Sequence, residues 1–363
     1  MCGFIFLRIV KTKSEYNYYK SFCRGRETII VLNLLFGIAL FLFGMNLMSE
    51  HLKKIAGSKT ELLLYRLTDK SLKSIAVGAG VTAFIQSSSA VSAMVVGLVE
   101  NRLIKLKRGI EIILGSIFGT AFTGWIVAYS SLQFSSPIAD LFSARIISAV
   151  FAIVGIVFKV FLKNVRIKRT GEILLGFSIL MLGISTISAA VEPMKENTMV
   201  LNAILQLKNP LLLAVIGVIL AALLQSASAA VGILQTLSVT GIIGLPTAFS
   251  LILGIGIGAS LPVLVSAIGR NNEAKRAAFS YLCINACGAL FCGIIALIAT
   301  RLIPQGAFAG EMTPISIALI NTMYRFAIMI GLYRFIPVIE KICVYTIKNK
   351  KGKKFENKGA VQS

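Results

Sequence analysis

The sequence lacks the usual signatures of an enzyme. It contains no Walker loop, no cluster of metal ligands and no nucleophile paired with a base. It has one histidine and only 15 acidic residues among 363. Its six cysteines lie mostly inside apolar runs and suggest no disulfide framework. We therefore expect no catalytic activity and no bound cofactor.

Acidic residues are scarce, but Lys and Arg number 37, which gives a net charge of +22. No aromatic residues interleave with this charge as in a nucleic-acid platform, so we expect no nucleic-acid partner. Instead, 26 of the 37 lie in five short segments between or after apolar runs: 51–73, 101–108, 159–171, 269–276 and 334–363. This pattern is typical of cytoplasmic loops in a membrane protein. The absence of any Asn-x-Ser/Thr acceptor favours a bacterial inner membrane over a eukaryotic surface.

Long apolar runs dominate the chain. Its residues are 56% hydrophobic and its mean hydropathy is +0.84. About 20 apolar residues are needed to cross the hydrocarbon layer, and continuous runs of this length recur. They do not alternate with period two, which disfavours a β-barrel. The sequence predicts an all-α integral membrane protein, embedded in a lipid bilayer, with crossing helices at 29–50, 109–131, 141–162, 171–191, 247–268, 277–300 and 314–335.

An internal repeat organises these helices. A shift of 139 residues aligns 84–119 with 223–258 without a gap, and 11 of the 36 pairs are identical. The aligned segments contain the motifs QSSSA and QSASA. The same shift pairs Gly37 with Gly176 and Gly44 with Gly183. The sequence therefore predicts two repeats, at 29–163 and 168–302.

Two segments, 71–99 and 210–239, are too long for one crossing and are interrupted at the Gln-Ser motifs. Their first arms span roughly 24 Å, less than the roughly 30 Å hydrocarbon core. If each is a re-entrant helical hairpin, all five basic segments fall on one side of the membrane. The first hairpin then opens to the cytoplasm and the second to the outside. The repeats are therefore expected to have inverted topology, as in many secondary transporters.

Three further segments complete the predicted organisation. Residues 1–28 form a basic N-terminal arm, which this topology places outside against its charge. We therefore expect an over-extended start to the chain. A final spanning helix is expected at 303–340, followed by a basic cytoplasmic tail at 341–363.

Polar residues at the two helix breaks are the main site candidates. A broken helix exposes amide groups at one stub, which attract anions, and carbonyls at the other, which attract cations. Hydroxyl and amide side chains extend this set: Gln86, Ser87, Ser88 and Ser89 at the first tip, and Gln225, Ser226 and Ser228 at the second. Tips that meet near the midplane would hold an oxyanion together with sodium, the latter through Gln86, Ser89, Gln225 and Ser228. Alternatively, these serines are small packing residues.

Arg325 lies within the last predicted crossing helix, where a charge is costly and usually functional or paired. It would bind an oxyanion through two parallel hydrogen bonds. A buried structural ion pair and a side chain that snorkels to the interface remain equally open. His51 lies at the cytoplasmic end of the first span, and there we expect a solvated surface position.

The duplicated motifs resemble those of the type II sodium–phosphate cotransporters, which carry QSSS at inverted hairpins. The resemblance covers residues 31–340, including the opening Phe41–Leu52 and the turn Asn272–Ala278. It implies that the Gln-Ser tips bind sodium and phosphate. It further points to Thr120, Ser260 and Asn285, which keep polar groups where family motifs have them.

The chain also departs from that family. The family motif GANIGTT reads GSIFGTA at 115–121 and GIGIGAS at 254–260, so Ile117 and Gly256 replace a polar Asn. Fewer oxygen ligands imply weaker sodium binding or fewer sodium ions per phosphate. A soluble helical regulatory domain, common in bacterial members, is not expected here.

The expected function is secondary active transport, with sodium-coupled symport of inorganic phosphate by alternating access. Sodium is the coupling ion, and inward flow is the default direction. Other functions stay open: transport of another oxyanion, coupling to protons, an uncoupled anion channel, or a non-transporting membrane scaffold. A homodimer is also open.

Overall fold

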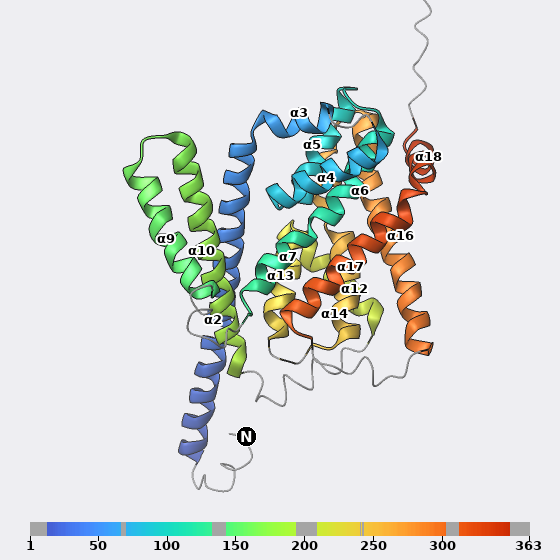
Figure 1. Ribbon diagram of the computed structural model, residues 1–363. Coiled ribbons are helices and arrows are strands. Elements are labelled where there is room, and N and C mark those ends of the chain that lie inside the picture. Colours follow the sequence, from blue (N-terminus) through green and yellow to red (C-terminus); the bar gives the residue numbers. More distant parts are fainter. Residues whose placement is uncertain are drawn as a thin grey trace, which may run out of the picture.

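The computed structural model describes residues 13–66, 70–132, 143–193, 209–239, 241, 243–302 and 312–348. Their regular elements are α-helices (Figure 1). Seven helices are long and apolar enough to cross a membrane: Thr28–Ala56, Leu106–Tyr129, Ala144–Phe161, Val165–Val191, Leu245–Ser266, Asn272–Ala299 and Pro314–Tyr333. These correspond to the seven predicted crossing helices. The prediction of a helical multi-span membrane protein is confirmed.

The ends of the chain differ from the predicted boundaries. Helix α2 (Lys13–Ala56) begins within the predicted N-terminal arm, so part of that arm continues the first span. Residues 1–12 lie outside the described residues. The final segment forms two helices, α17 (Pro314–Tyr333) and α18 (Ile336–Thr346), instead of one. Pro337 fits the first turn of α18 because its missing N–H is not needed there.

Both Gln-Ser motifs interrupt helices as predicted. The first separates α4 (Ser71–Ile85) from α5 (Ser88–Glu100), and the second separates α12 (Pro210–Leu224) from α13 (Ala227–Ser238). Gln86 and Gln225 end the first arms in the left-handed region, with φ of 61° and 51°. The following residues, Ser87 and Ser226, are extended and cap the second arms. Two repeat-equivalent positions thus share one local geometry.

A second pair of helix breaks was not predicted. The span 109–131 divides into α6 (Leu106–Gly119) and α7 (Ala121–Tyr129), and 247–268 divides into α14 (Leu245–Gly258) and α15 (Leu261–Ser266). In α6, the hydroxyls of Ser116 and Thr120 bond to helix carbonyls of their own turn, an arrangement that bends helices. In α15, Pro262 has no N–H to continue the ladder.

Helix α2 packs against α10 (Val165–Val191) through glycines. A Cβ atom at Gly44 would lie 2.6 Å from the carbonyl oxygen of Gly176, and one at Gly37 would lie 3.2 Å from that of Gly183. Because Gly37 faces the later and Gly44 the earlier glycine of α10, the two helices are antiparallel. They open the two predicted repeats and run in opposite directions.

The repeat also governs packing around the Gln-Ser breaks. Helix α4 packs on α6, and its counterpart α12 packs on α14. A Cβ at Gly115 would collide with the carbonyl of Ile75, and one at Gly254 with the carbonyl of Ala214. Both residues of the second pair lie 139 positions after those of the first. Small residues allow such close approach between membrane helices.

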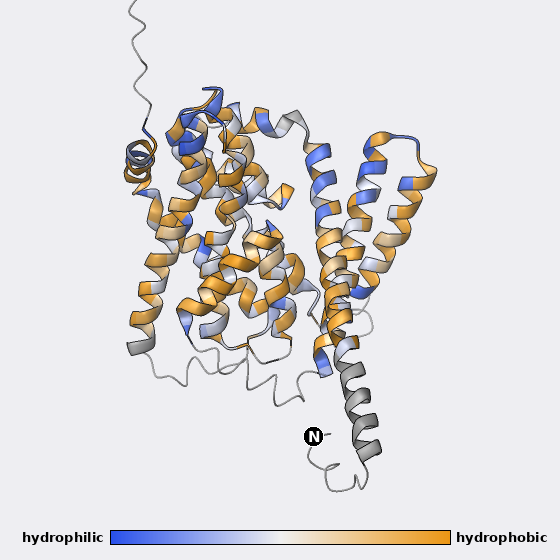
Figure 2. Cartoon of the chain, turned by 180° about the vertical axis from the view of Figure 1, so that it is seen from behind, coloured by the Kyte–Doolittle hydropathy of each residue, from blue (hydrophilic) through white to orange (hydrophobic). Residues whose placement is uncertain are grey.

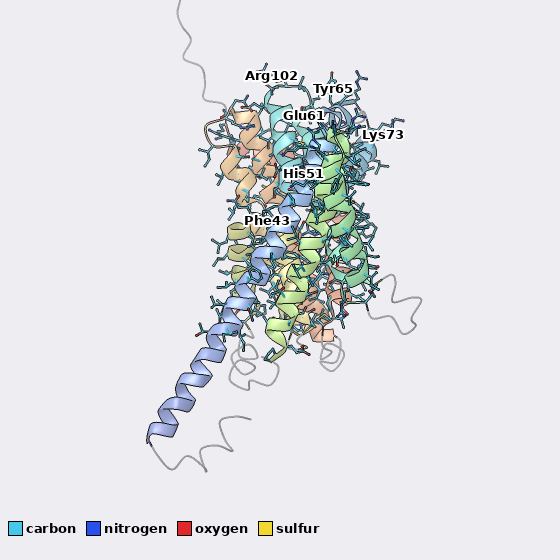
Figure 3. The ribbon with its side chains drawn as sticks, turned by 90° about the vertical axis from the view of Figure 1, so that its left-hand side faces the viewer. Phe43, His51, Glu61, Tyr65, Lys73 and Arg102 are labelled. Atoms are coloured by element: carbon cyan, nitrogen blue, oxygen red, sulfur yellow. The ribbon has the colours of Figure 1, made fainter. Side chains whose placement is uncertain are left out.

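The basic segments gather at one end of the molecule. Arg169 donates to the Lys54 carbonyl, Arg270 pairs with Glu100, and Arg276 donates to the Ile347 carbonyl. These bonds join α10 to the end of α2, the segment before α16 (Asn272–Leu302) to the end of α5, and α16 to the segment after α18. Figure 2 shows a hydrophilic end here, and Figure 3 places Lys73 and Arg102 at it, with Phe43 farther along α2.

The two broken helices open toward opposite ends. Arg108 donates to Ser71 at 3.0 Å, and Arg270 to Glu100 at 3.2 Å, so both outer ends of α4 and α5 lie at the basic end. Helix α13 ends near the start of α17, where Met312 donates to the Ile243 carbonyl. In Figure 1, α4 and α5 lie at the top and α12 and α14 below. Re-entry into a bilayer and inverted topology stay predictions.

Candidate anion and cation site at the helix breaks

Arg325 is the one buried charge in the middle of α17. Its side chain is 2% exposed. Its Nε donates to Asn321 Oδ1 at 2.9 Å and its Nη1 donates to the Ile117 carbonyl at 3.0 Å, whereas Nη2 has no partner. No carboxylate among the described residues pairs with it. Its burial disfavours a snorkelling side chain, and the two groups that hold the guanidinium are neutral. The anion-binding role of Arg325 stays a prediction.

Two tyrosines accompany Arg325. Ser88 of the first tip lies 3.0 Å from the hydroxyl of Tyr281 on α16. The hydroxyl of Tyr324 is buried and has no partner. Both rings lie within electrostatic range of the guanidinium. Neither tyrosine was among the predicted site residues, so two buried hydroxyls were missed.

Ser260 and Asn285 lie together beside the second repeat's α14. Asn285 Nδ2 donates to Ser260 Oγ at 3.3 Å and to the Tyr281 carbonyl at 2.9 Å. A Cβ atom at Gly256 would lie 3.1 Å from Tyr324 Oη and 3.4 Å from Asn285 Oδ1. Two predicted site residues therefore meet, and the glycine that replaces Asn leaves room beside them.

The end of α14 also releases backbone carbonyls. The Ser260 amide donates to Ile257 at 3.0 Å, so Gly256 does not receive its usual i+4 bond. Pro262 cannot donate to Gly258. Carbonyls freed at an unwound helix end are typical sodium ligands in transporters.

The first tip contains another buried oxygen without a partner. Gln86 Oε1 and Thr82 Oγ1, one turn apart on α4, both lack hydrogen bonds. Thr82 lies against α6, where a Cβ at Gly119 would be 2.8 Å from Thr82 Cβ. These two oxygens can accept from a ligand or coordinate a small cation.

The remaining predicted residues divide by role. Ser87 and Ser226 accept bonds from Ala90 and Ala229 at 3.3 and 3.2 Å, so their hydroxyls act as helix caps. Thr120 is buried and donates to Ser116 within its own turn. Ser89 is partly buried.

The second tip stands apart from the first. Ser228 is buried, while the Gln225 side chain is exposed. Among the described residues, no hydrogen bond or ion pair joins this tip to the first tip or to Arg325. The predicted meeting of the tips and the sodium roles of Ser89, Gln225 and Ser228 stay predictions.

Gln235 is a buried amide that the sequence analysis missed. Its Nε2 donates to the carbonyls of Gly124 on α7 and Pro314 on α17, both at 2.9 Å, and its Oε1 has no partner. A Cβ at Gly124 would lie 3.8 Å from Asn321 Nδ2. Gln235 therefore connects the second broken helix to α7 and to α17, the helix that carries Arg325. One feature of the sequence could have identified Gln235: it is an amide within an apolar helix, and the equivalent position of the first repeat is the apolar residue Val96.

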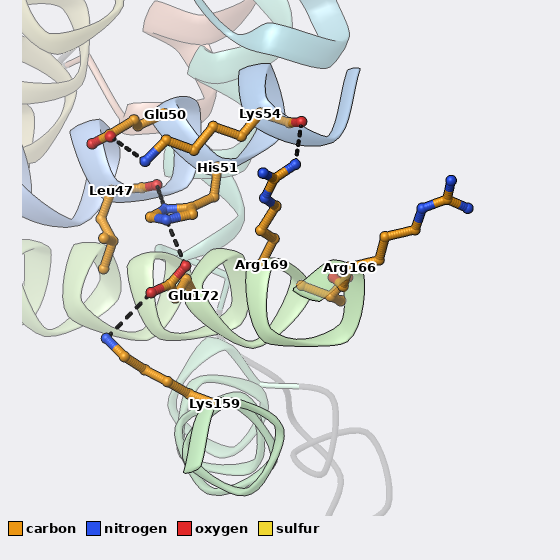
Figure 4. Close-up of polar contacts among 9 residues, drawn as sticks. Leu47, Glu50, His51, Lys54, Lys159, Arg166, Arg169 and Glu172 are labelled. Atoms are coloured by element: carbon orange, nitrogen blue, oxygen red, sulfur yellow. Dashed lines mark hydrogen bonds and ion pairs between the residues drawn. The ribbon is translucent and has the colours of Figure 1, made fainter. Parts of the chain in front are cut away.

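The prediction that His51 is solvated is wrong. His51 is 7% exposed, and its Nε2 lies 2.5 Å from Glu172 Oε2 (Figure 4). Its Nδ1 lies 3.0 Å from the Leu47 carbonyl, and Lys159 from α9 (Ala144–Phe161) reaches Glu172 at 3.4 Å. The imidazole is buried because α10 supplies a partner that sequence spacing along α2 does not reveal.

Comparisons with known proteins agree with this architecture. A family described as Na+/Pi-cotransporter matches residues 40–189. "Putative inorganic phosphate export protein YjbB" of Escherichia coli strain K12 is 28% identical over 263 residues, which cover 72% of this chain and 46% of that protein. "Uncharacterized protein YqeW" of Bacillus subtilis is 29% identical over 288 residues, which cover 79% of this chain and 87% of that protein.

The chain spans about half the length of the phosphate-export relatives that it matches. No solved structure matches it. The family match includes the first Gln-Ser break and the α6–α7 break that follows it. It confirms the resemblance of this chain to the sodium–phosphate cotransporter family.

Proposed function

We propose that this chain is a secondary transporter of inorganic phosphate, coupled to sodium, in a bacterial inner membrane. The observation that carries the proposal is Arg325. A buried guanidinium with an unpartnered N–H and no carboxylate nearby among the described residues is costly unless it meets an anion. This arrangement serves binding and transport of an anion, and we propose no enzymatic activity.

Phosphate is the favoured anion. The guanidinium suits tetrahedral oxyanions because it can donate two parallel hydrogen bonds. The buried hydroxyl of Tyr324, which precedes Arg325 in α17, and the hydroxyl of Ser88, which contacts Tyr281, can supply further donors. The family description and the name of the Escherichia coli relatives favour phosphate over other oxyanions.

Sodium is the proposed coupling ion. The oxygens of Gly256, Ser260 and Asn285 lie at the end of α14, and Gln86 Oε1 lies at the first tip. Uncharged oxygens from unwound helices suit a small hard cation. The proximity of both sets to helix breaks would let sodium order the site before phosphate binds.

Alternating access follows from the arrangement of the repeats. The antiparallel helices α2 and α10 and the opposite openings of the broken helices support an inverted repeat. We propose that α4–α5 and α12–α13 re-enter the membrane from opposite sides. Arg325 joins α17 to α6 of the first repeat through Ile117, and Tyr324 of the same helix faces Gly256 of α14 in the second repeat. The anion would therefore bind where α17 contacts both repeats. Rocking of the repeats about this site would then switch its access.

A proteoliposome assay tests this function. The full chain should accumulate phosphate when a sodium gradient is imposed, and Arg325→Leu should abolish accumulation. Arg334→Gln, at the exposed end of the same helix, is the matched control. Phosphate flux that does not depend on sodium would indicate a channel or coupling to protons. Flux of sulfate but not phosphate would indicate that another oxyanion is the substrate. Absence of any flux would indicate a non-transporting scaffold.

A further inference from the structure

We propose that Arg325 is a fixed cation of the site, so that each cycle moves one sodium ion with one divalent phosphate. The membrane potential would then drive phosphate outward. This inference rests on the proposed function and adds its stoichiometry and direction.

Two backbone carbonyls at equivalent positions of the repeats differ in their hydrogen bonding. The 139-residue shift pairs Ile117, near the end of α6, with Gly256, near the end of α14. The Ile117 carbonyl accepts a bond from Arg325 Nη1 at 3.0 Å. No Lys or Arg among the described residues donates to the Gly256 carbonyl, and the Ser260 amide turns to Ile257 instead. The carbonyl near the end of α6 is therefore bound by the fixed cation Arg325, whereas the equivalent carbonyl of α14 is available to a mobile cation.

The groups around Gly256 suit that mobile cation. A Cβ there would face Tyr324 Oη at 3.1 Å and Asn285 Oδ1 at 3.4 Å. Tyr324 Oη is buried and without a partner, and Ser260 Oγ lies 3.3 Å from the Asn285 amide. These atoms are uncharged oxygens, the ligand type that sodium prefers. The same helix α17 thus presents a fixed charge to α6 and a neutral hydroxyl to α14.

Charge balance limits the number of sodium ions. Arg325, one sodium ion and one divalent phosphate sum to zero, whereas a second sodium would leave a net positive charge in a poorly polarisable interior. Arg325 remains with the protein, so the transported cargo carries one net negative charge. A negative-inside potential favours export of such cargo, and each 100 mV supports about a 50-fold outside-to-inside ratio of the product of the sodium and phosphate concentrations.

Reconstitution with a set potential tests this directly. The full chain would be placed in proteoliposomes at alkaline pH, with a potassium gradient and valinomycin fixing the potential, and radioactive sodium and phosphate fluxes measured together. We expect one sodium per phosphate and faster flux toward the positive side. Two or more sodium ions per phosphate, or flux toward the negative side, would overturn the inference. Absence of any sodium-dependent phosphate flux would instead reject the proposed function.

Variants sharpen the test. Arg325→Gln should raise the ratio to two sodium ions per phosphate and remove the voltage response, because a mobile ion replaces the lost charge. Arg325→Lys should keep a ratio of one, and Arg334→Gln should behave as wild type. An active Arg325→Gln protein with the wild-type ratio would contradict the inference. If that variant does not transport, the wild-type ratio and voltage response still decide.

Discussion

At the scale of single residues, the described part of the chain has six buried polar atoms without hydrogen-bond partners, some of which belong to the proposed site. Each such atom costs about 1–3 kcal/mol, and folded proteins contain few of them. Among the described residues they are Thr82 Oγ1, Gln86 Oε1, Thr123 Oγ1, Gln235 Oε1, Tyr324 Oη and Arg325 Nη2. The set contains a charged donor and several oxygen acceptors, which suits joint binding of an anion and a cation.

Replacement of Gln86 tests the first tip. Gln86→Ala removes an unpartnered buried carbonyl, so we expect apparent phosphate or sodium affinity to fall about tenfold to a hundredfold. Gln225→Ala should have a smaller effect because that side chain is exposed. Uptake kinetics at matched protein levels provide the measurement. Equal kinetics for Gln86→Ala and wild type would make the first tip a packing element.

Gly256 offers a test of the cation site. The sequence comparison alone predicts that Gly256→Asn and Ile117→Asn restore sodium ligands and raise sodium affinity. The structure alters this expectation at Gly256, where a Cβ would lie 3.1 Å from Tyr324 Oη and force it to shift. We expect Gly256→Ala to weaken sodium affinity about tenfold, measured as the sodium concentration for half-maximal uptake. If the sodium dependence of uptake were unchanged in Gly256→Ala, Gly256 would not be part of the cation site.

Helix pairs are set by close contacts between backbones at the scale of elements. The α2–α10 crossing depends on glycines because a side chain there would enter the opposite backbone. The α4–α6 and α12–α14 pairs use the same device at repeat-equivalent positions. These close contacts determine the relative positions of the helices, and so hold the helix breaks against α16 and α17.

Matched glycine substitutions test this frame. Gly44→Ala should lower the free energy of unfolding of the detergent-solubilised protein by about 1–3 kcal/mol. The reason is that the new Cβ would lie 2.6 Å from the Gly176 carbonyl oxygen. Gly97→Ala, also in a helix but with no atom within 4 Å of the added Cβ, should be neutral or stabilising by up to about 1 kcal/mol. Similar losses of stability in Gly44→Ala and Gly97→Ala would show that the close α2–α10 contact does not depend specifically on Gly44.

The orientation of the whole molecule follows from its charged end. The described parts of the basic segments converge there, while Ile243, just before α14, bonds to Met312 at the start of α17. A protein with this distribution should insert with the basic end in the cytoplasm.

Cysteine labelling tests that orientation. In a chain with its native cysteines replaced by serine, Lys105→Cys and Lys168→Cys should react only with reagents that reach the cytoplasm. Gly244→Cys should react from outside, since the second broken helix opens there. Gly306, the other predicted external position, lies outside the described residues. Labelling of Lys105→Cys and Gly244→Cys from the same side would exclude inverted topology.

The sequence alone determined the features that depend on local composition. Seven apolar runs predicted seven crossing helices, because each run must satisfy its own backbone in lipid. The Gln-Ser motifs predicted the breaks before α5 and α13, where a serine caps the following helix. The 139-residue shift predicted that the chain is organised as two repeats.

Only the tertiary structure decided which polar groups meet. Arg325 reaches the Ile117 carbonyl across 208 residues, and Ser88 meets Tyr281 across 193. No periodicity encodes such pairs, because they arise from the crossing of distant helices. The break at Thr120 depends partly on such a pair, because the Ile117 carbonyl at the end of α6 accepts a bond from Arg325 on α17. His51 became buried because Glu172 on another helix takes the place of water.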